Sequence, residues 1–358
     1  MKGLTIHKTE HPKAKPAKGA KLGFGAVFTD HMMLMNWDKG QGWHDARIVP
    51  YGNIELSPAA TVLHYAQETF EGMKAYRADD GRILLFRPEE NFKRMNISNE
   101  RLCIPQLDVD FCVESLKELV MLDADWIPEQ EASSLYIRPM IIGNEAKLGV
   151  KEADSYIYAV LLSPSGPYYE SGLKPVPIYV EENFVRAVRG GTGFAKTGGN
   201  YASSMRAQEI AHEKGYSQVL WLDGVERKYV GEVGAMNIFF VVDGEVITPE
   251  LDGSILSGIT RKSMIQVLRD KGYTVTERPI TIQEIADAYD AGKLNEVFGT
   301  GTAAVISPVG ELKWGDKVMK INNGEIGPIS AYAYKTLTDI QWGRVKDPYG
   351  WSVEIGHM

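Results

Sequence analysis

The chain has 358 residues, of which 44% are hydrophobic and 24% charged; this is ordinary for a globular protein that builds full cores, and the length favours about two domains. A net charge of −8 gives no electrostatic basis for binding nucleic acid or an anionic membrane. The two cysteines, Cys103 and Cys112, provide neither a disulfide framework nor a metal site, so we expect small buried hydrophobic residues and no metal.

The first 21 residues contain six lysines and little apolar material, so we expect a solvated arm. They lack the apolar core of a secretory signal and the arginine and serine bias of a transit peptide. No apolar run reaches the length of a membrane span. The sequence therefore predicts a cytoplasmic protein.

Short strands and helices alternate in the first half of the chain. Strands are expected within residues 28–51 and in a hairpin at residues 74–86, which has an Asp-Asp-Gly turn. A serine–proline start and a glycine end predict a helix over residues 57–72. Two more helices are expected, one after Pro88 and one over residues 110–126. Two more strands are expected over residues 135–143 and 156–163. These elements predict an α+β domain over residues 1–171.

A proline-containing stretch separates the two halves. Pro175 and Pro177 are spaced so that we do not expect a central strand there, and residues 172–182 are interpreted as an interdomain linker. Residues 183–358 then form a larger second domain. Its Asp-Gly turns at 223–224 and 243–244 are flanked by strand-forming residues, which predicts antiparallel hairpins.

The most informative segment of the second half is the glycine-rich stretch 190–204, which contains Lys196 and precedes a predicted helix at 205–214. Backbone of this kind lets a flat group or a phosphate approach the main chain closely. Two chemistries fit the lysine. It either grips a nucleotide phosphate or condenses with an aldehyde cofactor to give an imine.

The nucleotide hypothesis depends on residues 190–197, which match the phosphate-loop pattern except that Ala195 replaces the last glycine. Such a loop must follow a buried parallel strand. Residues 183–189 carry two arginines and no continuous apolar run, and the predicted hairpins do not fit a nucleotide-binding core. We keep a nucleotide-binding protein as an alternative, together with a non-catalytic binding protein.

Supporting features for an aldehyde cofactor occur elsewhere in the second half. Residues 251–261, with a helix expected after Ser257 and Gly258, and the small-residue loop 298–304 are both suited to phosphate. Glu232 lies among apolar and small residues, an unusual place for a carboxylate that is not paired. The alternative is a surface glutamate on an edge strand.

Seven short motifs, in order along the chain, resemble the branched-chain amino acid aminotransferases, pyridoxal-phosphate enzymes of fold type IV. The motifs are FEGMKAY (70–76), LFRP (85–88), NFKRM (91–95), YIRP (136–139), IGNE (142–145), KTGGNY (196–201) and FGTGTA (298–303). The resemblance implies two α+β domains with mixed or antiparallel sheets, the larger one barrel-like. It also implies a homodimer.

The resemblance assigns roles around pyridoxal 5′-phosphate. Lys196 holds the cofactor as an imine and moves the proton, Glu232 contacts the pyridine nitrogen, and Tyr201 lies near the ring hydroxyl. Arg94 is the charged phosphate ligand, which agrees with the bidentate way in which a guanidinium binds phosphate. The other phosphate ligands implied are the backbone amides of Ile259 and Thr260 and the hydroxyl of Thr302.

The same resemblance implies leucine, isoleucine, valine and their 2-oxo acids as substrates, with 2-oxoglutarate and glutamate as the other pair. The implied pocket consists of Phe24, Tyr65, Tyr136, Val150 and Tyr168, with Tyr65 and Val150 supplied by a second subunit. Ala235 and Ala303 are expected at the substrate carboxylate. Arg138 either orients the pocket or meets the second carboxylate of glutamate. A D-amino-acid aminotransferase or an aminodeoxychorismate lyase of the same fold is the nearest alternative.

Overall fold

The computed structural model describes residues 3–17, 19–166 and 173–358. It divides into two compact units of α+β type, each with its own sheet. Unit 1 comprises residues 1–168, 195–198 and 339–358, and unit 2 comprises residues 169–194 and 199–338. Among the described residues, no helix combines the length and the apolar character that crossing a membrane requires.

Unit 1 is built on a nine-stranded, mainly antiparallel sheet. Its strands are β1 (Thr5–Ile6), β2 (His31–Asp38), β3 (Gly42–Pro50), β4 (Glu68–Phe70), β5 (Met73–Arg77), β6 (Arg82–Phe86), β7 (Ser134–Gly143), β8 (Ser155–Ser165) and β18 (Ser352–His357). The path runs β1-β3-β2-β8-β7-β5-β6-β18, and β4 pairs with β7. Its helices are α1 (Thr61–Tyr65), α2 (Pro88–Arg101), α3 (Val109–Leu122) and the 3-10 turn η1 (Ala124–Trp126).

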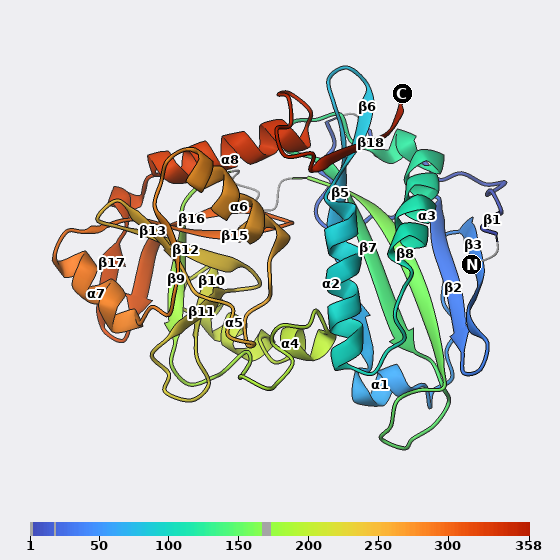
Figure 1. Ribbon diagram of the computed structural model, residues 1–358, viewed down its shortest axis with the longest axis horizontal. Helices are drawn as coiled ribbons and strands as arrows, with labels where there is room; N and C mark the ends of the chain where they lie inside the picture. The colour runs from blue at the N-terminus through green and yellow to red at the C-terminus, as the bar shows by residue number, and fades with distance from the viewer. Residues whose placement is uncertain (1–2, 18, 167–172) are drawn as a thin grey trace. The chain divides into compact units, whose positions relative to one another are not determined.

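One face of this sheet is covered by α2 and α3 (Figure 1). Both helices present apolar side chains at helical spacing, among them Phe92 and Leu116, which pack against alternate residues of the strands, such as Met33. The alternation places neighbouring residues on opposite faces, so that Leu135 and Ile137 belong to this core and Tyr136 does not. The strands and helices predicted for residues 74–163 are confirmed, except that the helix expected over residues 110–126 ends at Leu122 and is followed by the 3-10 turn η1.

Unit 2 contains a second nine-stranded sheet, which is mixed. Its strands are β9 (Val176–Glu181), β10 (Gln218–Leu222), β11 (Val230–Val233), β12 (Asn237–Val242), β13 (Glu245–Thr248), β14 (Val275–Glu277), β15 (Leu294–Gly301), β16 (Val305–Trp314) and β17 (Lys317–Lys320). The helices are α4 (Gly198–Ala202), α5 (Met205–Glu213), α6 (Ile259–Asp270), α7 (Ile282–Asp290), η2 (Asn322–Gly324) and α8 (Pro328–Gln341). The two predicted hairpins are confirmed as the antiparallel pairs β10–β11 and β12–β13.

The helix predicted over residues 57–72 is too long, because only Thr61–Tyr65 form a helix. The helix α1 ends at Ala66, whose left-handed backbone (φ 49°) closes it. The chain then pairs with β7 through β4, with Thr69 opposite Ile141. Pairing with an existing strand satisfies the backbone of these residues, and this tertiary contact overrides the local helix signal.

The expectation that the proline-containing stretch forms no central strand is also wrong. β9 lies between β10 and β16 and is parallel to both. The register with β16 shifts next to Pro177, and a bulge of this kind accommodates a residue that has no N–H to donate. Pro177 still accepts a hydrogen bond from the N–H of Ser217 (2.9 Å).

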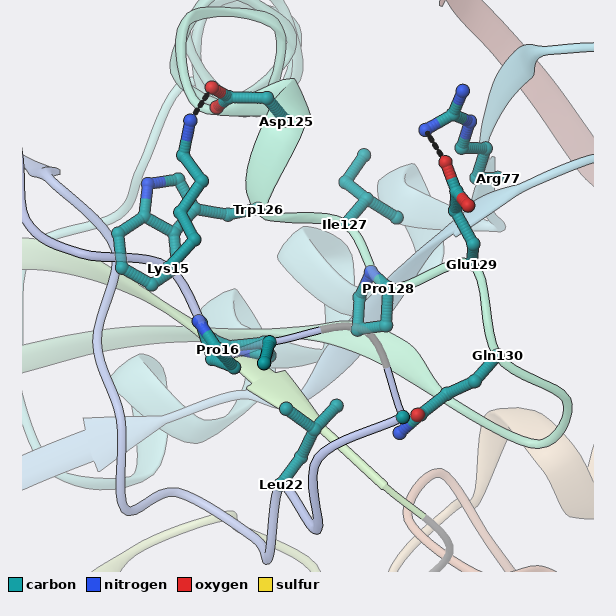
Figure 2. Close-up of a pocket in the computed structure, with 13 residues that line it drawn as sticks. Lys15, Pro16, Leu22, Arg77, Asp125, Trp126, Ile127, Pro128, Glu129 and Gln130 are labelled. Atoms are coloured by element: carbon teal, nitrogen blue, oxygen red, sulfur yellow. Dashed lines mark hydrogen bonds and ion pairs between the residues drawn. The ribbon is translucent and has the colours of Figure 1, made fainter.

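The N-terminal arm is mostly exposed to solvent, as expected, and it is also attached to unit 1. β1 pairs in parallel with β3, and the Lys13 N–H donates to Asp30 Oδ1 (2.7 Å). Figure 2 shows Lys15, Pro16 and Leu22 around a cavity of about 280 Å³ that residues 125–130 also line, and Lys15 pairs with Asp125 there. Most side chains of the arm are still exposed.

The two cysteines differ from each other. Cys112 is buried in the core, and burial raises the pKa of its thiol to about 12. Cys103 is exposed and has a left-handed backbone (φ 55°) just after α2. The prediction of a small buried residue is therefore confirmed for Cys112 and wrong for Cys103.

Candidate active site

Lys196 belongs to a four-residue segment, Ala195–Gly198, that packs with unit 1. Its backbone N–H donates to Ser98 Oγ on α2 (2.8 Å), and its carbonyl accepts from the N–H of Phe70 on β4 (3.0 Å). The ε-amine lies 4.7 Å from the centre of the Phe70 ring. The lysine is thus fixed by its main chain to a strand and a helix of unit 1.

A buried ion pair lies in the same region. Glu71 is fully buried and accepts two hydrogen bonds from Arg94, at 2.7 Å from Nε and 2.8 Å from Nη2. Burial acts to raise the pKa of Glu71, but the charge of Arg94 and its hydrogen bonds, with contributions from Lys196 and Asn91, lower that pKa below its ordinary value. Glu71 is therefore held as a carboxylate, and it fixes the Arg94 guanidinium on α2.

Glu68 is a second carboxylate beside the lysine segment. It accepts from the N–H of Gly198 and from the Thr197 hydroxyl. Burial raises its pKa, although these hydrogen bonds and the charges of Arg138 and Lys196 act in the opposite direction. Sequence analysis assigned no role to Glu68 or Glu71. For Glu71 the signal was available, because an acidic residue in a short apolar run is the same feature that drew attention to Glu232.

Three of the residues expected in the substrate pocket meet within unit 1. The Phe24 and Tyr136 rings contact edge to face, with centroids 4.7 Å apart. Arg138 donates from Nη2 to the Tyr136 hydroxyl (3.1 Å), and its guanidinium lies 4.7 Å from the Phe70 ring centre. A Cβ at position 72 would overlap the Tyr136 hydroxyl. Gly72 is therefore required for this close approach.

A buried lysine lies next to this group. Lys74 on β5 pairs with Tyr136 on β7, so the two side chains share a face of the sheet. Burial lowers the pKa of Lys74 to about 8.

Two other expected pocket residues lie at the surface of unit 1. Tyr65 donates its hydroxyl to the carbonyl of Leu148 (2.6 Å) and is 39% exposed. Val150, in the same loop as Leu148, is 84% exposed. The structure thus joins α1 to the 148–150 loop and leaves large apolar side chains exposed there. Tyr168 lies outside the described residues.

In unit 2, Glu232 is buried on the edge strand β11, with 4% of its surface exposed. Arg186 Nη2 lies 2.8 Å from its Oε2, and the backbone N–H of Leu256 donates to its Oε1 (3.1 Å). The alternative of a solvent-exposed glutamate is excluded. The guanidinium and the backbone N–H provide the hydrogen bonds that a buried carboxyl group requires.

The glycine-rich loop of unit 2 is fixed by the same arginine. Arg186 also donates to the carbonyl oxygen of Ser254 (2.6 Å). A Cβ at position 193 would overlap this same carbonyl oxygen, so Gly193 is required for the close packing of the loop. Further along, the Thr192 hydroxyl donates to Asn200 Oδ1 and Asn200 Nδ2 donates to the Thr192 carbonyl, both at 2.7 Å. These bonds fix the loop on both sides of residues 194–199.

The N-terminus of α6 has the features of an anion site. Its N-cap is Gly258, and no described side chain caps the helix, so the first N–H groups, of Ile259 and Thr260, point out of the helix end. Asn237 lies against this end, since a Cβ at Gly258 would overlap its Oδ1. Across β12 and β15, Asn237 pairs with Thr300, whose buried Oγ1 has no hydrogen-bond partner among the described residues.

Four of the expected site residues lie elsewhere in unit 2. Tyr201 is half-buried in α4, and Ala235 is exposed in the turn between β11 and β12. Thr302 and Ala303 follow β15 in a half-buried turn. Thr302 is two residues beyond Thr300, so the orphaned hydroxyl and the loop suited to phosphate belong to the same end of β15.

The structure also tests the phosphate-loop hypothesis. β9 ends at Glu181, and residues 182–197 form neither helix nor strand. The helix that follows, α4, has only five residues. A nucleotide-binding loop joins a buried parallel strand directly to a full helix, so the arrangement around Lys196 is of a different kind.

The two α+β units, each with its own curled sheet, have the architecture of fold type IV enzymes. A sequence model described as Amino-transferase class IV matches residues 68–312, well over half of the chain. The chain belongs to this family of aminotransferases.

Relatives and solved structures agree with this. The chain is 56% identical to branched-chain-amino-acid aminotransferase 2 of Bacillus subtilis over 355 residues, covering 99% of this chain and 97% of that protein. It is 54% identical to branched-chain-amino-acid transaminase 1 of the same organism, covering 97% and 98%. The crystal structure of the Escherichia coli branched-chain amino acid aminotransferase is similar, with a TM-score of 0.76 and 26% identity over 90% of this chain and 99% of that one. A T.th. branched-chain amino acid aminotransferase complexed with N-(5′-phosphopyridoxyl)-L-glutamate is also similar, with a TM-score of 0.72 and 28% identity over 90% and 98%.

Proposed function

We propose that this protein is a pyridoxal-phosphate-dependent aminotransferase that interconverts leucine, isoleucine and valine with their 2-oxo acids, using 2-oxoglutarate and glutamate as the other pair. The observation that carries the proposal is 56% identity, over 99% of the chain, to a branched-chain-amino-acid aminotransferase. The buried charges of both units support it, because they match the groups that such a cofactor requires.

The described residues fit the cofactor's phosphate. Arg94 is held by Glu71 with a fixed orientation, and a guanidinium binds phosphate through paired hydrogen bonds. The N–H groups of Ile259 and Thr260 at the start of α6, and the hydroxyl of Thr302, are the other ligands in this proposal. The buried Thr300 Oγ1, which has no partner among the described residues, supports a polar group bound at this end of β15.

The bound cofactor supplies an aldehyde carbon for the amino group and a heteroaromatic ring that withdraws electrons from the substrate α-carbon. Glu232 would hold the ring nitrogen of the cofactor, and Arg186 fixes the Glu232 carboxylate for this role. Tyr201 contacts the ring hydroxyl. These roles need a fixed carboxylate, and the bonds of Glu232 to Arg186 and Leu256 support that requirement.

Lys196 first holds the cofactor covalently and then acts as the base and acid of the reaction. Its amine would accept the proton of the substrate α-carbon and then donate it again. Because the lysine backbone is bonded to Ser98 and Phe70, the side chain moves the proton while the main chain stays in place. We expect ping-pong kinetics, since the two oxo acids react in turn.

Branched side chains are selected by packing rather than by polar contacts. Phe24 and Tyr136 form an apolar wall of the substrate pocket, and the edge-to-face contact of their rings supports this role. Tyr168 is assigned to the same pocket. Ala235 and Ala303 lie at the substrate carboxylate. Arg138 orients Tyr136, and its buried Nε, which has no hydrogen-bond partner among the described residues, supports binding of the second carboxylate of glutamate.

The proposal includes a cytoplasmic homodimer. The exposed apolar side chains of Leu63, Tyr65, Leu148 and Val150 support an interface at this surface. In such a dimer Tyr65 and Val150 contact the substrate of the other subunit. The oligomeric state is checked by light scattering of the purified protein, and a monomer would contradict this part of the proposal.

Half-reactions test the function directly. We expect the purified protein with pyridoxal phosphate to absorb as a lysine-bound cofactor, and L-leucine and L-glutamate each to shift that band. D-alanine is expected to leave the band unchanged. A response to D-alanine alone would identify a D-amino-acid aminotransferase, and no response to any amino acid, with magnesium-dependent ATP binding instead, would identify a nucleotide-binding protein.

A further inference from the structure

The lysine segment is bound to unit 1 at three points. The Lys196 N–H and carbonyl bond to Ser98 and Phe70, and the Gly198 N–H bonds to the carboxylate of Glu68. The two elements that provide these partners, β4 and α2, are themselves joined by a buried hydrogen bond from Thr69 Oγ1 to Asn99 Oδ1 (2.6 Å). The segment therefore rests on a rigid support.

Glu68 provides the contact on the C-terminal side of the lysine. Its carboxylate accepts from the Gly198 N–H and the Thr197 hydroxyl, so it holds the two residues that follow Lys196. A Cβ at position 198 would overlap Glu68 Oε1 and lie 3.3 Å from its Cδ. The chain approaches the carboxylate as closely as only glycine permits.

A carboxylate in this position is costly unless its bonds compensate for it. Glu68 is half-buried, and its burial disfavours the charged form. Arg138 and Lys196 offset this cost electrostatically. The hydrogen bonds that Glu68 accepts from the lysine segment offset the free-energy cost of burying its carboxylate. They also require an acceptor at this position.

We propose that Glu68 is a positioning residue for Lys196: by binding Thr197 and Gly198 it fixes the lysine segment on β4 and α2, and keeps the ε-amine over the Phe70 ring. The inference rests on the proposed function, in which Lys196 transfers the proton. Proton transfer between two carbon atoms depends on the amine being held to a fraction of an ångström, because a displacement of about 1 Å costs about 100-fold in rate.

The first test compares Glu68→Ala with Glu68→Gln, which keeps an acceptor oxygen in the same place. Hydrogen exchange is measured on the full-length protein, with and without pyridoxal phosphate. We expect Glu68→Ala to speed exchange of the Lys196 and Gly198 amides by about tenfold or more, and Glu68→Gln to stay within about threefold of wild type. Glu114→Ala, at an exposed glutamate of α3, is the matched control and should leave these amides unchanged.

Kinetics of the loaded enzyme give the second readout. We expect Glu68→Ala to lower kcat for leucine by about 100-fold while KM changes by less than about threefold, because the amine is misplaced and the substrate pocket is intact. Glu68→Gln should recover most of kcat. Unchanged exchange and unchanged kcat in Glu68→Ala would overturn the proposal, as would faster exchange throughout unit 1, which would indicate a general structural role.

A second variant keeps the proposal testable if Glu68→Ala folds poorly. Gly198→Ala pushes a methyl group against Glu68 and should also speed exchange at Lys196 and lower kcat. In the double variant Glu68→Ala, Gly198→Ala the methyl group has room, so the second substitution should cost less than it does in wild type. An equal loss of kcat from Gly198→Ala in wild type and in Glu68→Ala would contradict a contact between residue 198 and Glu68. Absence of transaminase activity in wild type would refute the proposed function alone, since the exchange measurement is independent of it.

Discussion

The two units present charged groups in different ways. In unit 1 the candidate groups are side chains in a connected network, in which Glu71 pairs with Arg94 and Glu68 holds the segment of Lys196. In unit 2 the candidate phosphate ligands are mainly backbone N–H groups at the start of α6, next to a carboxylate, Glu232, held by Arg186.

This difference predicts how each unit responds to substitution. A side-chain network loses its function when one member is truncated, because a buried partner is left without its opposite charge. Backbone N–H donors cannot be removed by truncating a side chain. Anion binding at a helix N-terminus is therefore weakened by a substitution that displaces the helix. Unit 1 should therefore be sensitive to loss of charge and unit 2 to changes of shape.

The largest effect is expected for Lys196→Ala. Loss of the amine removes both covalent attachment of the cofactor and proton transfer, so the transamination rate should fall by about 10⁴-fold or more. The unit 2 ligands remain, and weak cofactor binding should persist in a spectral titration. Lys117→Ala, on the surface of α3, is the control. If the Lys196→Ala enzyme stayed active and borohydride still fixed the cofactor to it, Lys196 would be excluded as the attachment site.

The next largest effect concerns the buried pair of unit 1. Glu71→Ala removes the carboxylate that the buried Arg94 guanidinium binds through two hydrogen bonds, and it should cost about 3–5 kcal/mol of unfolding free energy. Chemical denaturation of the cofactor-free protein measures this loss. Arg94→Ala should cost a similar amount, and the double variant Glu71→Leu, Arg94→Met less than the sum of the single substitutions. Additive losses would mean that the two groups do not interact.

A smaller effect is expected in unit 2 for Gly258→Ala. The added Cβ would overlap Asn237 Oδ1 and lie 3.2 Å from the Cβ of Arg261, so α6 or Asn237 must shift. Cofactor affinity should fall by about 5- to 100-fold, as overpacking costs about 1–3 kcal/mol. Gly231→Ala is the matched control, since its Cβ would lie 3.7 Å from the nearest described atom, the carbonyl oxygen of Trp221. Equal affinities of the two variants would argue against the helix end as the phosphate site.

The smallest effect is the pH dependence of Glu68. Burial raises its pKa above the ordinary value of 4.5, although Arg138 and Lys196 act against this. The folded state then binds a proton that the unfolded state has released, so this group makes stability fall as pH rises from 4.5 through the raised pKa. Denaturation curves across this interval should show the fall in wild type and a smaller fall in Glu68→Gln. Parallel curves would contradict the raised pKa.

Motifs and alternation in the sequence predicted much of this protein. The paired strands and helices of residues 74–163 followed from periodicity, because their side chains meet one core. Lys196 and Glu232 were selected from the residues alone, and the structure places both in fixed, hydrogen-bonded surroundings. The roles assigned to Arg94, Tyr201 and the pocket residues came from family resemblance and stay predictions.

Other features depended on partners distant in the sequence. The stretch after Ala66 reads as helix, yet it forms β4 because β7 offers a free pairing edge. Pro177 enters a central strand because the register with β16 shifts beside it. Glu68 looked ordinary in the sequence because its partner, Gly198, lies 130 residues away. Glu71 stands in a short apolar run, but its pairing with Arg94, 23 residues away, is visible only in the structure.

The sequence by itself predicted an α+β first half, antiparallel hairpins in the second half, and Lys196 and Glu232 as candidate groups, since these depend on local composition and spacing. Only the tertiary structure decided that Lys196 is fixed by β4 and α2, that Glu71 pairs with Arg94, and that Arg186 pairs with Glu232. Such contacts form when long-range packing brings buried charges together, because a buried charge is stable only next to a partner that local sequence does not specify.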